Sequence, residues 1–471
     1  MNPFIATLVY VTGIAGLFYL DRNASLRTSK ALWLPVVWIS IVGSRAVSVW
    51  FNMSPADSDV QMDGSPLDRV VFALLLVGGL VVLVNRGRKS SAALKANWPI
   101  LAYFAFCLVS VVWSDFPDVA AKRWIKAIGD LVMVLIIVTD GNPIGALKRV
   151  LARAGFILLP ASVLLIKYFP GLGRGYDPWF GMQSDLGVTT NKNTLGVITF
   201  ILSLGALWRV LELFRAKGQP NRRRHLVAQF TLLAFGMALL AMANSATSLA
   251  SFALGSVLLV AGTLRAVRRH PGAIHALVLT MVAAGGLSLV IGGTAGIAHV
   301  MGRKGDLTGR TEIWSALIPM APNSVVGAGF ESFWLGPRLE AALRDFPGLP
   351  LNEAHNGYLE VYLNLGFVGV FLIALILVTG YGRAVATFRR DPLFGSLLLA
   401  YIASAAVYSF TEAGFRMLDP IWIFLLYAVV AASAAAPRRE AVPVERFGAP
   451  ADRFATSSAT RSAIATTMMK K

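Results

Sequence analysis

The chain alternates long apolar runs with short polar segments. Most runs hold roughly 16–22 residues, about the length that a helix needs to cross ~30 Å of hydrocarbon. Spanning helices satisfy their own backbone hydrogen bonds, so the pattern predicts an all-α, polytopic transmembrane helical bundle of about 13 spans (12–14). The predicted spans are 3–20, 31–51, 70–84, 99–113, 125–139, 154–168, 194–214, 226–243, 249–264, 273–297, 358–379, 393–410 and 418–435. The count becomes even if 70–84 or 125–139 is re-entrant.

The charges between the apolar runs form two alternating sets. The basic set includes Arg22, Arg27, Arg86, Arg88, Lys148, Arg149, Arg223, Arg224, Arg268, Arg269, Arg389 and Arg390. The acidic or mixed set includes Asp57, Asp59, Asp115, Asp118, Asp177, Asp185, Glu412 and Arg416. The positive-inside rule places the basic set in the cytoplasm. It therefore predicts an N-terminus outside and a C-terminus in the cytoplasm.

Composition agrees with a membrane protein and excludes several other classes. The chain is 56% hydrophobic and 14% charged, which would leave a soluble domain with too much exposed apolar surface. The net charge of +18 is spread over short clusters, and nucleic acid is not an expected partner. The single cysteine, Cys107, cannot form an intrachain disulfide. Residues 1–20 lack a basic n-region and are read as a retained span.

Four regions follow from this organisation. Residues 1–298 hold ten spans, 299–355 form a large extracytoplasmic loop, 356–436 hold three spans, and 437–471 are a predicted disordered cytoplasmic tail. Long loops in compact proteins are usually functional, so the large loop is where we expect chemistry.

His355 is the histidine that begins a recognisable pattern. It lies at the exit of the large loop, within Asn352-Glu353-Ala354-His355-Asn356. A histidine at the membrane–water interface can be neutral near pH 7 and can accept a proton from a hydroxyl. The alternative is a helix-capping or interfacial histidine without a chemical role.

The pattern around His355 resembles a known family. His355-Asn356, nine residues, and then Gly366 and Gly369 are similar to the motif of the O-antigen ligase family, which includes Wzy-type polymerases and ExoQ-like exopolysaccharide polymerases. Further similar segments are Trp113-Ser114-Asp115, Asn191-Lys192-Asn193, Thr308-Gly309-Arg310-Thr311-Glu312 and Gly327-Ala328-Gly329-Phe330. The turn 244–248 departs from ligases because it lacks an arginine, which favours the polymerase-like branch.

The resemblance implies a membrane glycosyltransferase in the bacterial inner membrane. Its donor would be an undecaprenyl-diphosphate-linked glycan, and its acceptor a glycan or a lipid-linked glycan. Other implied partners are membrane lipids and a polysaccharide export system. His355 would be the general base of an inverting transfer, and Arg310 would stabilise the diphosphate. Predicted substrate-binding residues are Arg123, Lys126, Lys192, Asn193, Asn356 and Glu353. Snorkelling to the interface is the alternative for Arg123 and Lys192.

No cofactor and no metal are expected. The large loop has no Asp-x-Asp pair, and Asp57-Ser58-Asp59 is interpreted as a solvated acidic turn.

Aromatic residues and charges within apolar runs give further expectations. Outer-loop aromatics could either line a glycan groove or anchor at the interface; these are Tyr176, Trp179, Phe180, Phe330, Phe333 and Trp334. Arg45, Asp130 and Glu212 lie in or beside apolar runs, and Asp130 is a candidate partner for Arg45. The competing functions are an exporter of polysaccharide or lipid-linked sugar, and a non-catalytic scaffold.

Overall fold

The computed structural model describes residues 2–435 except 24–25, 54–63, 177–181, 217, 219, 271, 293–307, 348 and 350. The predicted tail, the Asp57–Asp59 turn, Trp179 and Phe180 therefore lie outside the described residues. The described chain is mostly helical, and its one small sheet pairs β1 (Arg174–Tyr176) antiparallel with β2 (Gln183–Asp185).

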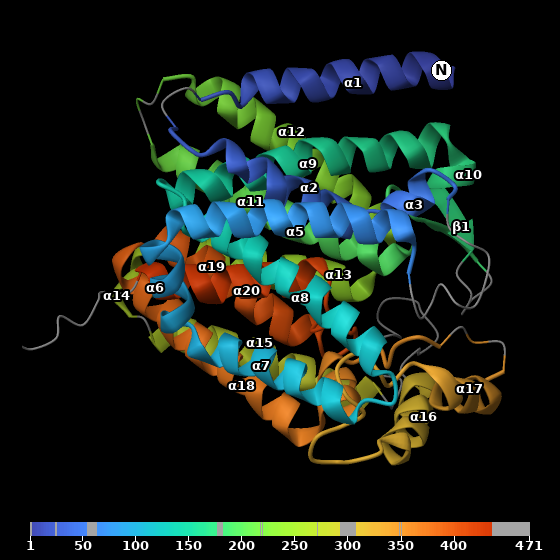
Figure 1. The fold of residues 1–471 in the computed structure, drawn as a ribbon. Helices are drawn as coiled ribbons and strands as arrows, with labels where there is room; N and C mark the ends of the chain where they lie inside the picture. Colours follow the sequence, from blue (N-terminus) through green and yellow to red (C-terminus); the bar gives the residue numbers. More distant parts are fainter. Residues whose placement is uncertain are drawn as a thin grey trace, which may run out of the picture. The chain divides into compact units, whose positions relative to one another are not determined.

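The helices follow the predicted apolar runs (Figure 1). In chain order they are α1 (Pro3–Leu20), η1 (Lys30–Leu32), α2 (Trp33–Val42), α3 (Val47–Trp50), α5 (Pro66–Arg86), α6 (Arg88–Ala96), α7 (Trp98–Val109), η2 (Ser110–Trp113), α8 (Pro117–Val138), α9 (Pro143–Tyr168), α10 (Pro170–Gly173), α11 (Lys192–Arg215), α12 (Arg222–Ala243), α13 (Ala246–Ala261), α14 (Arg265–Arg269), α15 (Gly272–Gly292), α16 (Thr308–Leu317), η3 (Ile318–Met320), α17 (Gly336–Asp345), α18 (Gly357–Arg390), α19 (Pro392–Tyr408) and α20 (Pro420–Ala435).

A helix overlaps each predicted span, but not all of these helices have spanning length. Within the described residues, six helices are long and apolar enough to cross a membrane, and a bent pair, Arg88–Ala96 with Trp98–Trp113, would make a seventh. Five more apolar helices have 10–17 residues. The structure therefore supports a helical membrane protein, and the figure of about 13 crossings stays a prediction.

Two of the predicted spans differ in detail from the structure. The span predicted at 31–51 breaks after Val42, and Arg45 lies in the break, where its guanidinium donates to the carbonyl oxygens of Thr189 and Leu172. In contrast, 70–84 lies on the continuous helix α5, and all but the last residue of 125–139 lies on the continuous helix α8. Neither helix is broken as a re-entrant segment would be.

The helices divide into an interior group and a peripheral group. α11 is buried along most of its length and packs against α9, α12, α13 and α20, whereas α1 and α5 leave many apolar side chains exposed. Exposed apolar surface of this extent is typical of helices that face lipid. α1 packs against α9 and α12 at one edge of the bundle (Figure 1).

The described part of the large loop is an ordered structure with its own small core. α16, η3 and α17 enclose buried side chains that include Ile313, Leu317, Phe333 and Trp334. The segment 323–329 is hydrogen-bonded to α18 where that helix bends: Ala328 and Gly329 donate to Leu363 and Asn364, and Phe367 and Val368 donate to Ser324 and Val325. The loop is therefore fixed to the helix that follows it.

The bend in α18 depends on a glycine of the predicted motif. Gly366 has φ +62°, and a Cβ there would lie 2.2 Å from the carbonyl carbon of Val325. An L side chain fits neither the backbone angle nor the close approach. Gly366 therefore has a structural role, because it lets the 323–329 segment reach the helix.

Ion pairs between distant segments follow the predicted alternation of loops. Arg310–Glu412 and Arg338–Asp115 join segments that were assigned to the outer side, whereas Arg86–Asp140 joins two that were assigned to the cytoplasm. In the structure, segments predicted to be outer loops therefore contact one another. Which end faces the cytoplasm stays a prediction.

Candidate active site

His355 lies directly before α18 in a strained backbone conformation. Its φ is +48°, which is uncommon for a residue with a side chain. The next residue, Asn356, caps the helix, since its side-chain oxygen accepts from the backbone N–H groups of Tyr358 and Leu359 at 3.0 Å each. Strain of this kind persists only where surrounding contacts enforce it, and it is frequent at functional sites.

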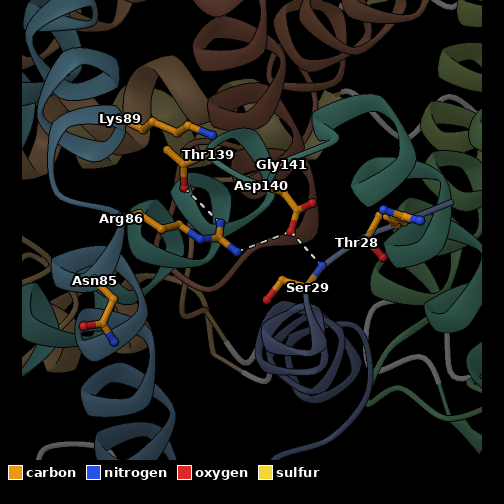
Figure 2. Close-up of a pocket in the computed structure, with 9 residues that line it drawn as sticks. Thr28, Ser29, Asn85, Arg86, Lys89, Thr139, Asp140 and Gly141 are labelled. Atoms are coloured by element: carbon orange, nitrogen blue, oxygen red, sulfur yellow. Dashed lines mark hydrogen bonds and ion pairs between the residues drawn. The ribbon is translucent and has the colours of Figure 1, made fainter.

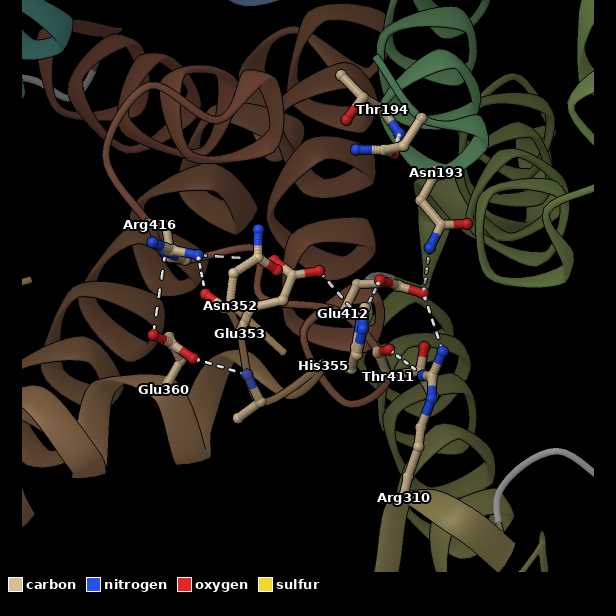
Figure 3. A network of polar contacts seen from close by, with 12 residues as sticks. Asn193, Thr194, Arg310, Asn352, Glu353, His355, Glu360, Thr411, Glu412 and Arg416 are labelled. Atoms are coloured by element: carbon tan, nitrogen blue, oxygen red, sulfur yellow. Dashed lines mark hydrogen bonds and ion pairs between the residues drawn. The ribbon is translucent and has the colours of Figure 1, made fainter. Parts of the chain in front are cut away.

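Glu412, between α19 and α20, brings the predicted catalytic residues together (Figure 3). Its Oε1 accepts from Asn193 Nδ2 at 3.1 Å and from Arg310 Nη2 at 3.4 Å, and its Oε2 lies 3.3 Å from His355 Nδ1. Glu353 Oε1 lies 3.0 Å from the same ring nitrogen. Arg310 also donates to the carbonyl of Thr411, beside Glu412. Side chains from three other segments, those of Asn193, Arg310 and His355, therefore meet at the buried carboxylate of Glu412.

Arg416 connects this cluster to a second set of carboxylates. Its Nη2 donates to Glu331 Oε2 at 3.1 Å, its Nη1 lies 3.7 Å from Glu353 Oε2, and its Nε lies 3.9 Å from Glu360 Oε1. Glu360 in turn accepts from Trp334 Nε1 at 2.7 Å and from the backbone N–H of Ala354 at 2.9 Å. The residues on both sides of His355 are thereby held by charged contacts.

The electrostatics of the cluster favour charged forms. Burial lowers the pKa of His355, but its hydrogen bonds to Glu353 and Glu412, together with the charges of those carboxylates, outweigh burial and raise that pKa to about 10. Burial raises the pKa of Glu353, whereas the hydrogen bond from His355 and the charges of His355, Arg416 and Arg310 bring it down to about 2. The raised pKa favours the imidazolium form of His355 in the resting site near pH 7.

The same three residues have the spacing of a metal-binding group. One ligand atom each from Glu353, His355 and Glu412 lies within 4.8 Å of the others. However, Arg310 contacts Glu412, and Arg416 contacts Glu353. These two guanidinium groups supply positive charge where a divalent cation would need to bind. The donor set therefore fits an ion-pair cluster better than a metal centre.

The structure brings together most, but not all, of the predicted site residues. His355, Arg310, Glu353, Asn193 and Asn356 lie in or beside the cluster. Arg123 reaches it indirectly, since its guanidinium donates to the backbone carbonyl of Glu331.

Lys126 and Lys192 lie elsewhere. The charges that act on Lys126 are those of Asp68, Arg123 and Arg69. Lys192 lines a separate cavity of about 310 Å³ with Arg174, Asp185 and Asn244. Lys192 precedes Asn193 on the first turn of α11, and successive helical residues project in different directions.

The structure also corrects two expectations about other residues. Phe330, Phe333 and Trp334 are buried, so they pack the protein interior and form neither a glycan groove nor an interfacial anchor; Tyr176 is exposed. Asp130 does not pair with Arg45. Its carboxylate accepts from Trp38 Nε1 at 2.8 Å and from the backbone N–H of Leu418 at 2.9 Å.

Sequence reasoning missed the residues that hold the cluster together. Glu412 and Arg416 were assigned only to a short mixed-charge outer turn, and Glu331 and Glu360 were not singled out. The available signal was that Glu412 and Arg416 are charges in a short turn between two apolar runs. A buried charge requires a partner, which could have directed attention to that turn.

The site and the fold define a helical membrane protein that carries an ion-pair cluster built from loops at one end. The model of a family described as O-antigen ligase, Wzy_C, matches residues 230–374, which include Arg310 and the His355–Gly369 motif. The exopolysaccharide production protein ExoQ of Rhizobium meliloti (strain 1021) is 27% identical over 357 residues, which cover 72% of this chain and 77% of that protein. The chain is therefore similar to the O-antigen ligase and ExoQ-like family, and the resemblance carried by the motif is confirmed.

Proposed function

We propose that this protein is a membrane glycosyltransferase of the polymerase or ligase kind, acting in exopolysaccharide or O-antigen assembly. It would join undecaprenyl-diphosphate-linked oligosaccharides outside the cytoplasm, in the bacterial inner membrane. The observation that carries this proposal is the meeting of Arg310 and His355 on the carboxylate of Glu412. The name of the ExoQ relative supports exopolysaccharide production as the process.

Each group in the cluster has a role in a direct displacement. The acceptor hydroxyl attacks the anomeric carbon of the donor, the bond from that carbon to the diphosphate breaks, and the configuration inverts. His355 in its neutral form takes the hydroxyl proton on Nε2, while Nδ1 stays against Glu353 and Glu412. These carboxylates orient the ring and stabilise the imidazolium that forms. Arg310 compensates the charge that grows on the leaving diphosphate.

The position of the cluster favours an enzyme over an exporter. A transporter is expected to place its polar groups near the middle of the membrane, between broken helices. Here Arg310 and Glu353 come from the large loop, and Glu412 comes from the connection between α19 and α20. The arginine-free turn between α12 and α13 further supports the polymerase branch.

The test is an in vitro reaction with the purified chain, lipid-linked repeat units and products resolved by length. His355→Gln and Arg310→Gln are each expected to lower the rate by at least about a hundredfold, because each removes a group that acts in the transition state. Arg338→Gln is the matched control, since it removes an arginine of the same loop that pairs with Asp115 outside the cluster. Full activity in both His355→Gln and Arg310→Gln would refute the proposal.

A further inference from the structure

A second cavity lies at the opposite set of loops, among residues that the proposed reaction does not use. It encloses about 750 Å³ and is formed by the α1–α2 connection, the end of α5, the start of α6 and the α8–α9 connection (Figure 2). Its lining residues are Arg27, Thr28, Ser29, Asn85, Arg86, Lys89, Thr139, Asp140 and Gly141. All of them belong to segments that the charge pattern assigns to the cytoplasmic side.

The cavity carries an excess of positive charge, and its buried residues are held in place by hydrogen bonds. Arg86 donates to Thr139 Oγ1 at 3.0 Å and to Asp140 Oδ2 at 3.3 Å, and the backbone N–H of Ser29 donates to the same carboxylate oxygen at 3.1 Å. Thr139 and Asp140 are buried, whereas Arg27 and Lys89 are exposed. Three cations thus face one carboxylate that is already hydrogen-bonded. This balance favours an anion.

The cavity opens beside a lipid-facing helix surface. On α5 the side chains of Val70, Leu74, Val77, Val81 and Val84 follow helical spacing, and each is more than half exposed. This stripe ends one residue before Asn85 and two before Arg86, which line the cavity. A surface of this kind accommodates an acyl chain below a headgroup.

An interfacial aromatic residue lies close to the cavity as well. Trp33, four residues after Ser29, is partly exposed, and the guanidinium of Arg153 lies 4.3 Å from the centre of one of its rings. Tryptophan and arginine gather where headgroups meet hydrocarbon. This aromatic–cation pair supports a position of the α1–α2 connection near the lipid headgroups.

We propose that this basic cavity, defined by Arg27, Arg86, Lys89 and Asp140, binds the phosphate-bearing headgroup of an anionic membrane phospholipid, with one acyl chain along the Val70–Val84 stripe of α5. The bound lipid bridges the α1–α2 connection to α5 and α6.

Native mass spectrometry of the purified full chain tests this proposal with phosphatidylglycerol as the probe. Each exposed cation beside an anionic headgroup contributes several-fold to affinity, so Arg27→Gln/Lys89→Gln is expected to weaken phosphatidylglycerol binding about thirtyfold. Both side chains are exposed, so the substitutions leave the buried contacts of Arg86 with Asp140 in place.

The matched control is Arg268→Gln/Arg269→Gln, which removes two exposed cations of α14 from the same predicted side. It is expected to bind phosphatidylglycerol like the unmodified chain. Equal loss in both double variants would overturn the proposal, because the effect would then be one of total charge.

Two further arms identify the ligand. Zwitterionic phosphatidylcholine is expected to bind about tenfold or more weakly, because its net charge is zero. Glycerol 3-phosphate carries the phosphate without an acyl chain, and a large excess is expected to leave phosphatidylglycerol bound. Displacement by glycerol 3-phosphate would show a site for soluble phosphates and overturn the assignment to lipid, as would equal binding of the two phospholipids.

Discussion

The two polar regions of this protein use charge in opposite ways. In the Glu412 cluster, Arg310, Arg416 and His355 are each held against carboxylates in a largely buried setting. In the basic cavity, Asp140 offsets Arg86, and the rim carries the exposed Arg27 and Lys89. A buried charge needs an oppositely charged partner within the protein, whereas an exposed cation at a membrane interface can pair with an anionic lipid. The difference supports the proposed chemistry in the first region and the proposed lipid binding in the second.

Removing the charge of Glu412 tests this comparison most strongly, because it is expected to lower the transfer rate. Glu412→Gln keeps the size of the side chain but leaves Arg310 and His355 without their shared carboxylate. We expect the transfer rate to fall roughly tenfold to a hundredfold, the usual cost of losing a group that orients a catalytic residue. The in vitro assay measures this.

Arg27→Gln/Lys89→Gln, which changes the two exposed cations of the basic cavity, is the control in that assay. It should keep its rate in detergent, where the basic cavity does not take part in the reaction. A rate for Glu412→Gln equal to that of the unmodified chain would mean that the cluster is only structural.

The pH profile sharpens the role of His355. Its pKa is raised to about 10, so the neutral form that accepts a proton grows as pH rises toward that value. With chemistry rate-limiting, kcat/KM should increase about tenfold per pH unit from pH 7 to 9. A profile that is flat over this range would show that another group takes the proton.

Glu412→Gln should also shift this profile. Loss of one of the two carboxylates beside the ring lowers the pKa of His355, so the rise begins at lower pH. If the substitution left the pH profile unchanged, Glu412 would not influence the group whose titration sets the rate.

A third prediction concerns stability rather than chemistry. Gly366→Ala places a Cβ 2.2 Å from the Val325 carbonyl carbon at a positive φ, so the 323–329 segment must move away from α18. We expect a loss of about 2–4 kcal/mol in the free energy of unfolding. Thermal unfolding in detergent measures it.

Gly382→Ala is the control for that substitution, because a Cβ at this position of α18 meets nothing within 4 Å. It should leave the unfolding temperature unchanged or raise it slightly. Equal unfolding temperatures for the two variants would contradict the structural role given to Gly366.

Chelation is expected to have the smallest effect. Arg310 and Arg416 already neutralise the Glu412 and Glu353 carboxylates, so EDTA should leave the transfer rate unchanged. Loss of activity with EDTA that added magnesium or zinc restores would instead assign Glu353, His355 and Glu412 as metal ligands.

Sequence predicted the helices well because apolar run length reports directly on burial in lipid or in the bundle. It could not predict the break near Arg45 or the bend at Gly366. Both depend on tertiary contacts: Arg45 with the carbonyls of Thr189 and Leu172, and Gly366 with Val325.

Only part of the candidate site could be predicted from the sequence, for the same reason. Arg310 and His355 each lie in a short segment that resembles the family, so a single sequence points to both. Glu412 is 57 residues from His355, and its role depends on packing between α18, α19 and α20. The aromatic pair Phe333 and Trp334 was misread because periodicity does not show that a loop encloses a core of its own.

The central claim is that the Glu412 cluster faces the extracytoplasmic side and meets its lipid-linked donor there. Cys107 is buried and can be replaced by alanine, which allows single cysteines elsewhere to be labelled in intact cells with a membrane-impermeant maleimide. Val325→Cys, exposed in the large loop, should label in intact cells, whereas Ala266→Cys, exposed on α14, should label only after permeabilisation. The reverse pattern would place the cluster in the cytoplasm and contradict the account.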